Sequence, residues 1–371
     1  MHDLGVYIHI PFCSAKCCYC DFVSFSGMEH LHELYVNRLL DEIRTANVRQ
    51  ITTVYIGGGT PTVLHAGLLH KILTCVSDLP IAREAEFTIE INPGTVTRDY
   101  LQVIRASGIS RLSFGLQSTC NSKLSIIGRL HTYEQFLENY FCARDIGFDN
   151  INVDLMFGLP CQTVCDYEKT LIKILNLNPQ HISFYSLTPS EGTPLLNDLI
   201  SGRLSLPDDE LDRKMYHLTT DLLAKYGFNH YEISNAALPG YECIHNVNCW
   251  QHRPYIGFGL GASSFDGQRR WSNPSNFTDY FSGVKPEIQF LSKDELISEA
   301  MILRLRFLSG VNESLFESEY GIKPSVVYYN QIDKLVANGL IECSTGQIRL
   351  TSLGLDLANQ VFMCFLPEGK S

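Results

Sequence analysis

Three cysteines near the start of the chain are the residues best suited to metal chemistry. Cys13, Cys17 and Cys20 follow a C-x3-C-x2-C spacing, which puts three thiolates within one short loop. An iron-sulfur cube usually takes four cysteine ligands, so three of them predict a [4Fe-4S] cluster with one iron open to another ligand. Cys18 is a candidate fourth ligand, but it adjoins Cys17, and neighbouring residues do not easily reach two corners of one cube. A tetrahedral zinc site and free buried thiols are the alternatives on spacing alone.

The elements that would position these cysteines alternate between strands and helices as far as Leu187. The predicted strands are Leu4–Ile10, Ile51–Gly57, Glu86–Asn92, Ser110–Leu116, Asn150–Leu155 and His181–Leu187. The predicted helices include His30–Thr45, Tyr133–Ile146 and, after the last of these strands, Asp208–Lys225. Strands separated by helices indicate parallel βα units, and therefore a wound sheet or a barrel. The cysteine loop follows the first strand and so lies at a carboxyl end.

Polar side chains occupy alternate positions within these strands. Glu90 and Asn92 alternate with isoleucines, and Asn152 and Asp154 alternate with aliphatic residues. A parallel sheet covered by helices on both faces would instead have nearly continuous aliphatic strands. One polar face per strand predicts an α/β fold in which an incomplete (β/α)6 barrel holds a polar ligand. The reactive groups of such a barrel lie at the carboxyl ends of its strands.

The character of the sequence changes after this region, and we expect three parts. Residues 1–235 form the barrel, and residues 236–290 form a connecting segment rich in Gly and aromatic residues. Residues 291–371 predict a smaller α+β domain in which helices precede a β-hairpin, as in a winged helix. Winged helices often bind DNA, but this part holds seven Lys and Arg against ten Asp and Glu, a net charge of −3. We therefore expect a packing module and no nucleic-acid partner.

Composition limits the class of protein further. The 371 residues carry a formal charge of −11, which argues against binding to nucleic-acid phosphates. No apolar run approaches the roughly 20 residues that a membrane helix needs, and the N-terminal segment does not resemble a signal peptide. Thirteen scattered cysteines, an odd number, suggest reduced thiols and a metal site rather than a disulfide framework. These features together predict a cytoplasmic protein.

The cysteine motif on the first βα loop resembles that of the radical SAM superfamily, where SAM is S-adenosylmethionine. Within that superfamily the chain is similar to the anaerobic coproporphyrinogen oxidase family, and specifically to its heme-chaperone branch. The similarity covers almost the whole chain. Besides the cysteine motif it rests on the segments Tyr7–Cys13, Gly57–Pro61, Glu90–Pro93, Arg111–Ser118, Gly128–His131, Asn152–Leu155, Gly158–Pro160, Tyr231–Asn235 and His245–Trp250.

This resemblance implies a SAM site. In the family the open iron of the cluster binds SAM, which an electron from the cluster cleaves. The glycine-rich segment, which lacks side chains that would block a close backbone approach, implies SAM contacts from Gly58, Gly59 and Thr60. The other residues that the resemblance assigns to SAM are Tyr7, Tyr19, Glu90, Gln117, Arg129 and Asp154. The two acidic residues suit ribose hydroxyls and the positive sulfonium, and Arg129 suits the carboxylate.

Each of these motifs, taken alone, has a simpler interpretation. The segment Gly57–Pro61 could be an ordinary turn, and it differs from a phosphate-binding P-loop because the Lys-Ser/Thr end is missing. Glu90 or Asp154 could be a paired structural carboxylate. Arg129 could form a surface ion pair. Their order along the chain, at successive strand ends after a cysteine triad, favours the ligand site.

Two functions compete within the family. One is an oxygen-independent coproporphyrinogen III oxidase, which decarboxylates porphyrinogen propionates. The other is a chaperone that binds heme and transfers it to an acceptor protein. The oxidases carry a further cysteine two residues after the triad and a longer arm before it. Here Asp21 and Phe22 follow Cys20, and twelve residues precede Cys13, so the resemblance favours the chaperone and predicts no oxidase activity.

The segment His245–Trp250 supports the chaperone interpretation. It resembles the H-N-x-x-Y-W motif of that branch, which implies that His245 is the heme ligand, as an exposed imidazole beside aromatic residues. The implied partners are heme, an unidentified heme acceptor and an electron donor such as a flavodoxin or ferredoxin. Four residues depart from the family pattern: Cys249 replaces tyrosine, Ser263 stands where many relatives have histidine, Cys161 replaces glycine and Cys18 replaces proline.

Overall fold

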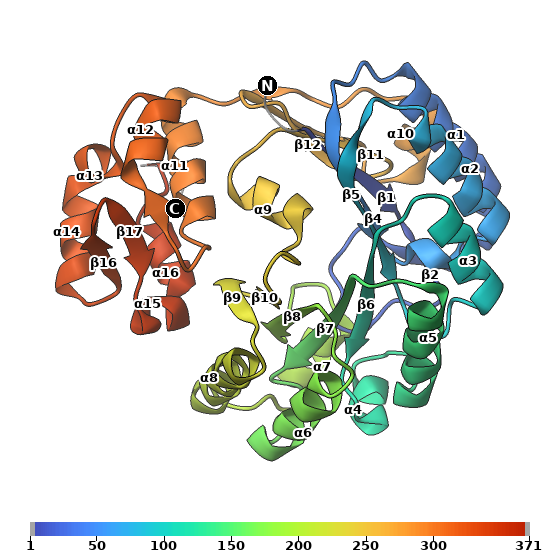
Figure 1. Cartoon of the computed structure of the whole chain (residues 1–371), viewed down its shortest axis with the longest axis horizontal. Helices are drawn as coiled ribbons and strands as arrows, with labels where there is room; N and C mark the ends of the chain where they lie inside the picture. Colours follow the sequence, from blue (N-terminus) through green and yellow to red (C-terminus); the bar gives the residue numbers. More distant parts are fainter. Residues whose placement is uncertain (1–3, 368–371) are drawn as a thin grey trace.

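The computed structural model describes residues 4–367. A large sheet dominates it, with the strand order β14-β13-β12-β11-β1-β4-β5-β6-β7-β8-β10-β9. Its centre consists of parallel neighbours, namely β1 (Leu4–Ile10), β4 (Ile51–Gly58), β5 (Ile81–Ile91), β6 (Arg111–Gln117), β7 (Ile151–Phe157) and β8 (His181–Ser186). The sheet curves into an open arc (Figure 1). The predicted α/β fold with an incomplete barrel is confirmed.

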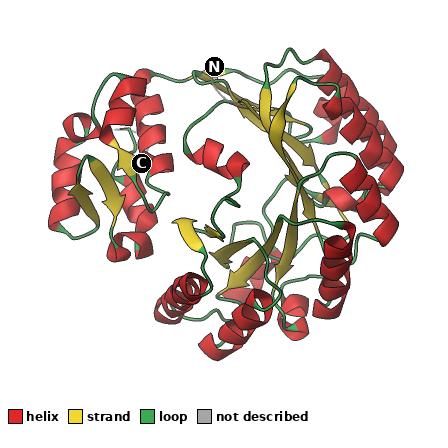
Figure 2. Cartoon of the chain, in the orientation of Figure 1, coloured by secondary structure: helices red, strands yellow, loops and turns green. Residues whose placement is uncertain are grey.

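Helices cover the outer, convex face of this arc (Figures 1 and 2). They are α1 (His32–Thr45), α2 (Ala66–Ser77), α3 (Arg98–Ala106), α5 (Tyr133–Ile146), α6 (Val164–Leu175) and α8 (Asp209–Lys225). Two short helices, α4 (Asn121–Ile126) and α7 (Pro194–Ile200), follow β6 and β8, and Leu195 of α7 packs with Cys18 of the cysteine loop. Local sequence fixes several boundaries. At the start of α5, Thr132 and Gln135 form a capping box, and Gly147 ends the helix in a left-handed conformation with φ of 96°.

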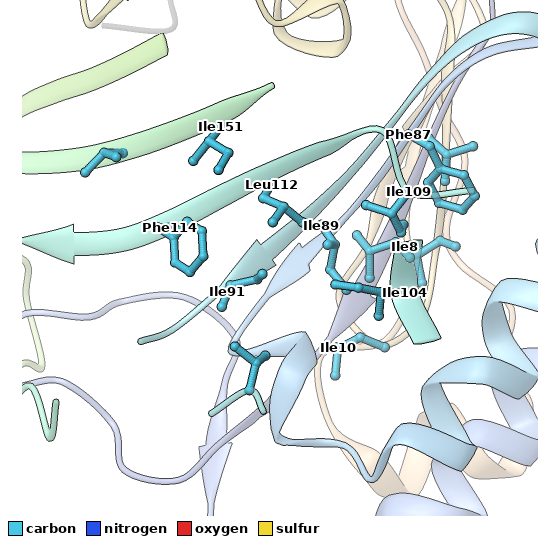
Figure 3. Close-up of a cluster of buried hydrophobic side chains, with 14 of the residues drawn as sticks. Ile8, Ile10, Phe87, Ile89, Ile91, Ile104, Ile109, Leu112, Phe114 and Ile151 are labelled. Carbon is cyan, nitrogen blue, oxygen red and sulfur yellow. The ribbon is translucent and has the colours of Figure 1, made fainter. Parts of the chain in front are cut away.

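The alternation seen in the sequence separates the two faces of the sheet. Figure 3 shows the outer face, where Ile89 and Ile91 of β5 and Leu112 and Phe114 of β6 lie with Ile104 of α3. Each of these side chains is 1% exposed or less. Burial of such side chains stabilises the fold by roughly 1.5–3 kcal/mol each. The polar residues of the same strands therefore face the inside of the arc.

Short strands extend the sheet at both ends. One end holds β9 (Asn229–Glu232) and β10 (Asn235–Ala237), and the other holds β11 (Tyr255–Phe258), β12 (Ser263–Phe265), β13 (Arg269–Ser272) and β14 (Gln289–Phe290). Because β11 pairs in parallel with β1, residues expected to form a connecting segment join the barrel sheet. Helix α9 (Ile244–Trp250) lies inside the arc, and α10 (Phe277–Ser282) follows β13 (Figure 1). The division of the chain at residues 235 and 290 stays a prediction.

The C-terminal part has its own hydrophobic core, which includes Met301, Phe316, Leu335 and Val361. Its helices are α11 (Lys293–Arg304), α12 (Glu313–Tyr320), α13 (Pro324–Val327), α14 (Tyr329–Ala337), α15 (Ser352–Asp356) and α16 (Ala358–Met363). Its sheet has the order β15-β17-β16 and contains β15 (Val311–Asn312), β16 (Ile341–Ser344) and β17 (Gln347–Leu350). The hairpin β16–β17 occupies the predicted position after the helices. The whole part faces the open side of the arc (Figure 1).

Among residues 4–367, no helix is long and apolar enough to cross a lipid bilayer.

Candidate functional site

A cavity of about 670 Å³ opens on the inner face of the arc, at the carboxyl ends of the parallel strands. Its walls bring together eleven of the thirteen residues predicted to bind the cluster or a ligand. These are Cys13, Cys17, Tyr19, Cys20, Gly58, Gly59, Thr60, Glu90, Gln117, Arg129 and Asp154. Tyr7 and His245 are not part of this lining. The position is the one at which parallel barrels place their reactive groups.

Two short parallel strands, paired with each other, flank the cysteine loop. The first strand is β2 (Phe12–Cys13) and its partner is β3 (Phe25–Ser26), which is followed by the 3-10 helix η1 (Glu29–Leu31). The Thr60 hydroxyl donates to Cys13 Sγ over 3.7 Å, and Arg129 Nη1 donates to Cys17 Sγ over 3.6 Å. Hydrogen bonds of this kind stabilise a thiolate.

Cys18 points away from the other thiols of the loop. Its Sγ donates to the carbonyl oxygen of Ile126 over 3.4 Å, and its side chain packs beside a small cluster that includes Ile127 and Leu195. Burial raises the pKa of the Cys18 thiol to about 11 and also raises the pKa of Cys13, so the direction of the Cys18 side chain, rather than its protonation, separates it from the other three. This geometry agrees with the predicted preference for Cys20 over Cys18.

In the described part of the chain, no three His, Cys, Asp or Glu side chains are arranged to hold a single metal ion. The thiolates of a cubane cluster each bind a different iron and need not converge on one point.

The glycines after β4 allow the strand end to contact the cysteine loop directly. A Cβ on Gly59 would lie 2.6 Å from the carbonyl oxygen of Phe12 and 2.9 Å from Cys13 Sγ. Gly58 has φ of 115°, a conformation that side chains rarely adopt. The Thr60 amide then donates to the Phe12 carbonyl over 2.7 Å, before the 3-10 helix η2 (Pro61–Val63). Glycine is therefore required here by the fold, in addition to the SAM contact that the resemblance implies.

Two carboxyl groups form one wall of the cavity. The Tyr55 hydroxyl donates to Glu90 Oε1 over 2.8 Å, and the Gly58 amide donates to Oε2 over 3.2 Å. Asn152 donates to Asp154 Oδ1 over 2.6 Å. Burial raises the pKa of Glu90 to about 7, with a further increase from the charge of Asp154. Burial also raises the pKa of Asp154. Two such groups favour a cationic ligand, because a positive charge stabilises both ionised forms.

Arg129 supplies the matching cation at the cluster end of the cavity. Its Nη2 donates to Asn92 Oδ1 over 2.6 Å and also to the carbonyl oxygen of Gly115. Its buried Nε has no hydrogen-bond partner. Gln117, with φ of 71°, accepts from the Tyr185 hydroxyl over 2.8 Å. The free guanidinium donor fits a carboxylate ligand, since unpartnered buried donors are costly.

Tyr7 lies beneath the cavity wall. Its hydroxyl forms a 2.9 Å hydrogen bond with His9 Nδ1, and its ring stacks on that of Tyr55 with 6.3 Å between centroids. Burial and the charge of Glu90 raise the pKa of Tyr7. The structure therefore places Tyr7 behind a residue of the lining.

The expectation that His245 is an exposed loop residue is wrong. It lies in the first turn of α9 and is 6% exposed. Its Nδ1 forms a 2.9 Å hydrogen bond with Thr53 Oγ1, and its amide donates to Glu86 over 3.1 Å. The side chain is buried because this carboxylate anchors the start of α9 inside the arc. Of the same motif, Asn246 and Trp250 do line the cavity.

Several cavity residues were missed in the sequence. These are Tyr55, Ser183 and Tyr185, of which Tyr55 donates to Glu90 and Tyr185 donates to Gln117. Asn92, which the strand parity had placed on the inner face, also lines the cavity and accepts from Arg129. The signal for Tyr55 was its parity, because it alternates with Val54 and Ile56 on β4 as Glu90 does with its neighbours on β5. That Asn246 and Trp250 line the cavity while His245 does not depends on the orientation of α9, which the sequence does not show.

Known families match two parts of this chain. Residues 7–174 match the family described as Radical SAM superfamily, and residues 291–357 match the HemN C-terminal domain.

Curated relatives extend the similarity to almost the full length. The chain is 36% identical over 367 residues to the heme chaperone HemW of Lactococcus lactis subsp. lactis, covering 98% of this chain and 97% of the relative. The identity is 35% to the heme chaperone HemW of Bacillus subtilis, with 98% and 99% of the two chains covered. It is 33% to the heme chaperone HemW of Escherichia coli K12, with 98% of each covered.

Among solved structures, the chain is similar to the coproporphyrinogen III oxidase HemN of Escherichia coli, a radical SAM enzyme. The TM-score is 0.85 at 23% identity, with 98% of this chain and 90% of that chain covered. At this identity the similarity concerns the fold.

Proposed function

This chain belongs to the radical SAM superfamily and, within it, to the family of the heme chaperones named HemW, and from that premise we propose that it binds heme and transfers it to an acceptor protein. The observation that carries the proposal is the similarity of 33–36% to three such chaperones over nearly the full length. Thirteen cysteines without a disulfide suit a reducing compartment, and we place the protein in the cytoplasm on that ground.

Cys13, Cys17 and Cys20 would hold the [4Fe-4S] cluster. The three thiols lie at one end of the cavity, and Cys18, the alternative ligand, bonds to Ile126 instead. When bound, the cluster supplies an electron and an open iron site for SAM. Arg129 would stabilise the Cys17 thiolate through its Nη1. A residue that does not bind the cluster itself would thus influence the cluster through one of its ligands.

SAM would occupy the rest of the cavity. The donors present fit its charges, since Arg129 Nε is free for the carboxylate and the Glu90–Asp154 wall attracts the sulfonium. Gly58, Gly59 and Thr60 would contact the methionine part of SAM. Gln117 and Tyr19 would form the side walls of the SAM cavity. Tyr7 would act through Tyr55 rather than by direct contact.

Heme would bind against α9, where Asn246 and Trp250 face the cavity. Burial lowers the pKa of His245 to about 4, so its imidazole is neutral and able to ligate iron. Ligation of heme iron by His245 would require the first turn of α9 to move, which would break the hydrogen bonds of His245 to Thr53 and Glu86. Burial raises the pKa of Cys249 to about 12, which disfavours a thiolate ligand in its place. The acceptor protein and an electron donor such as a flavodoxin or ferredoxin complete the proposed partners.

The test of this heme site is an anaerobic heme titration of two variants, followed in the Soret region. His245→Ala should shift the Soret band and weaken binding, because an axial nitrogen is lost. Cys249→Ala should bind heme with the wild-type spectrum. If both variants retain the affinity and spectrum of the wild type, the segment His245–Trp250 is not the heme site.

A further inference from the structure

The inner face of β4 carries two residues, Thr53 and Tyr55, that the sequence did not predict as part of the site. The Tyr55 side chain lies in the cavity wall, and its hydroxyl donates to Glu90 Oε1 over 2.8 Å. The other oxygen of that carboxylate accepts from the Gly58 amide over 3.2 Å. Two donors from one strand therefore fix the orientation of the Glu90 carboxylate.

His245 packs against the ring of Tyr55 from α9. The two ring centroids are 5.2 Å apart, with an interplanar angle of 31°. The imidazole is itself held, because Nδ1 bonds to Thr53 over 2.9 Å and the His245 amide bonds to Glu86 over 3.1 Å. The Tyr55 ring is thus packed against a residue that is anchored at two points.

We propose that Tyr55 and His245 form a positioning pair that orients Glu90 for SAM. Tyr55 holds the carboxylate directly, and His245 holds the Tyr55 ring from outside the cavity. The pair rests on the proposed SAM site, and it gives the buried histidine of the α9 motif a role in the heme-free protein. An aromatic contact of this kind adds stabilisation beyond the area that it buries.

The first test removes single groups and measures SAM affinity by anaerobic calorimetry on the cluster-loaded protein. Tyr55→Phe keeps the ring and removes the hydroxyl, and we expect the Kd for SAM to rise about tenfold, since a hydrogen bond to a charged group is lost. His245→Asn, which has no ring, should raise the Kd about fivefold although the residue does not line the cavity. His245→Phe, which keeps a ring, should restore most of the affinity.

The second readout is the pH dependence of SAM affinity, which a purely structural role would not change. The ionised Glu90 favours the positive sulfonium, so affinity should rise with pH through the Glu90 pKa, which is about 7. The Tyr55 hydrogen bond lowers this pKa, so Tyr55→Phe should move the midpoint to higher pH. The other charged or titratable groups that act on Glu90 or Tyr55 are Tyr7 of β1, Arg111 of β6, Asp154 of β7 and Cys243 before α9.

A matched control is His230→Ala on β9. His230 is a half-buried histidine that, like the buried His245, packs on an aromatic ring, with 5.4 Å to the centroid of Phe184, but it is not part of the cavity lining and does not contact Tyr55. Its loss should leave SAM affinity and the pH midpoint unchanged. Circular dichroism and cluster absorbance confirm that each variant is folded and loaded.

The variants distinguish a failure of the positioning pair from a failure of the proposed SAM site. If Glu90→Gln binds SAM as tightly as the wild type, the proposed SAM site is wrong. If Glu90→Gln weakens binding but Tyr55→Phe has wild-type affinity and an unshifted midpoint, the site stands and the positioning pair is refuted. In the double variant Tyr55→Phe/His245→Asn the Kd for SAM should rise by clearly less than the product of the two single increases, because the two residues act through one contact. A rise equal to that product would also contradict the pair.

Discussion

At the scale of single residues, the cysteine loop separates three thiols from a fourth. Cys13 and Cys17 accept hydrogen bonds from Thr60 and Arg129, while Cys18 donates to Ile126 outside the cavity. The C-x3-C-x2-C spacing selects Cys17 rather than Cys18, but it leaves Cys18 open as a fourth ligand. The direction of the Cys18 side chain argues against that role.

We expect Ala at Cys13, Cys17 or Cys20 to abolish the broad absorbance at about 400 nm of the reconstituted protein, because a cluster ligand is lost. Cys18→Ala is the matched control, one residue from Cys17, and should keep the absorbance and one cluster per chain. Iron and sulfide analysis measures the loading. Loss of the cluster in Cys18→Ala, together with its retention in Cys20→Ala, would show that the ligand assignment is wrong.

The ionised form of Glu90 favours SAM binding but lowers the stability of the SAM-free fold. The Glu90 pKa is raised from about 4.5 in the unfolded chain to about 7 in the folded protein. The folded state therefore binds more protons than the unfolded state between these values, and stability falls as pH rises through that window.

Glu90→Gln should accordingly stabilise the SAM-free protein at pH 8, by on the order of 2 kcal/mol, because a buried ionised carboxylate becomes neutral. The same variant should weaken SAM binding. Urea unfolding at pH 5 and pH 8 measures the effect, which should be present at the higher pH and nearly absent at the lower. Equal stability changes at both values would mean that Glu90 does not titrate in this way.

At the scale of elements, α9 is the part of the barrel that most affects the proposed functions. It has no side-chain cap of its own, and Glu86 of β5 accepts the amides of Ile244 and His245 over 3.1 Å each. Carboxylates at a helix start satisfy unpaired amides and interact favourably with the helix dipole. The helix is thus tied to the sheet by a residue more than 150 positions earlier in the chain.

Glu86→Gln should destabilise the protein by about 2 kcal/mol, since charge-assisted hydrogen bonds are lost. It should also speed hydrogen exchange at the first amides of α9. Glu84→Gln on the same strand is the control, because Glu84 is exposed, and it should change neither quantity. Unchanged exchange in Glu86→Gln would show that α9 is anchored by other contacts.

How much of this arrangement the sequence could predict depends on the length of the elements. The parallel strands were found because five or more residues of alternating character are recognisable, and that parity put Glu90 and Asp154 inside the arc. Strands such as β11 and β12 have four and three residues, too few for a periodic signal. The burial of His245 depends on Glu86 and Thr53, which are distant in sequence, so no local pattern could indicate it.

At the scale of the whole molecule, polar contacts tie the C-terminal part to the barrel. Arg306 pairs with the buried Glu232 over 3.3 Å, and its guanidinium lies 4.2 Å from the ring centroid of Trp250. Arg270 of β13 pairs with Glu299 of α11 through two hydrogen bonds. The C-terminal part therefore contacts α9 at Trp250, a residue of the cavity lining.

The resemblance to the oxidases leads to a prediction about catalysis. Anaerobic incubation with coproporphyrinogen III, SAM and a strong reductant should give no decarboxylated product, because Asp21 and Phe22 follow the triad where the oxidases carry a further cysteine. Porphyrin fluorescence after oxidation detects the product. Multiple turnovers would assign the chain to the oxidases despite its similarity to the chaperones.

The most direct test of the central claim is a heme titration of the anaerobically reconstituted wild-type protein, with the Soret absorbance recorded at each addition. A heme chaperone of this family should give a saturable Soret shift with one heme per chain, while the cluster stays intact. Absorbance that rises linearly, as for free heme, with no saturation up to a several-fold excess would contradict the account.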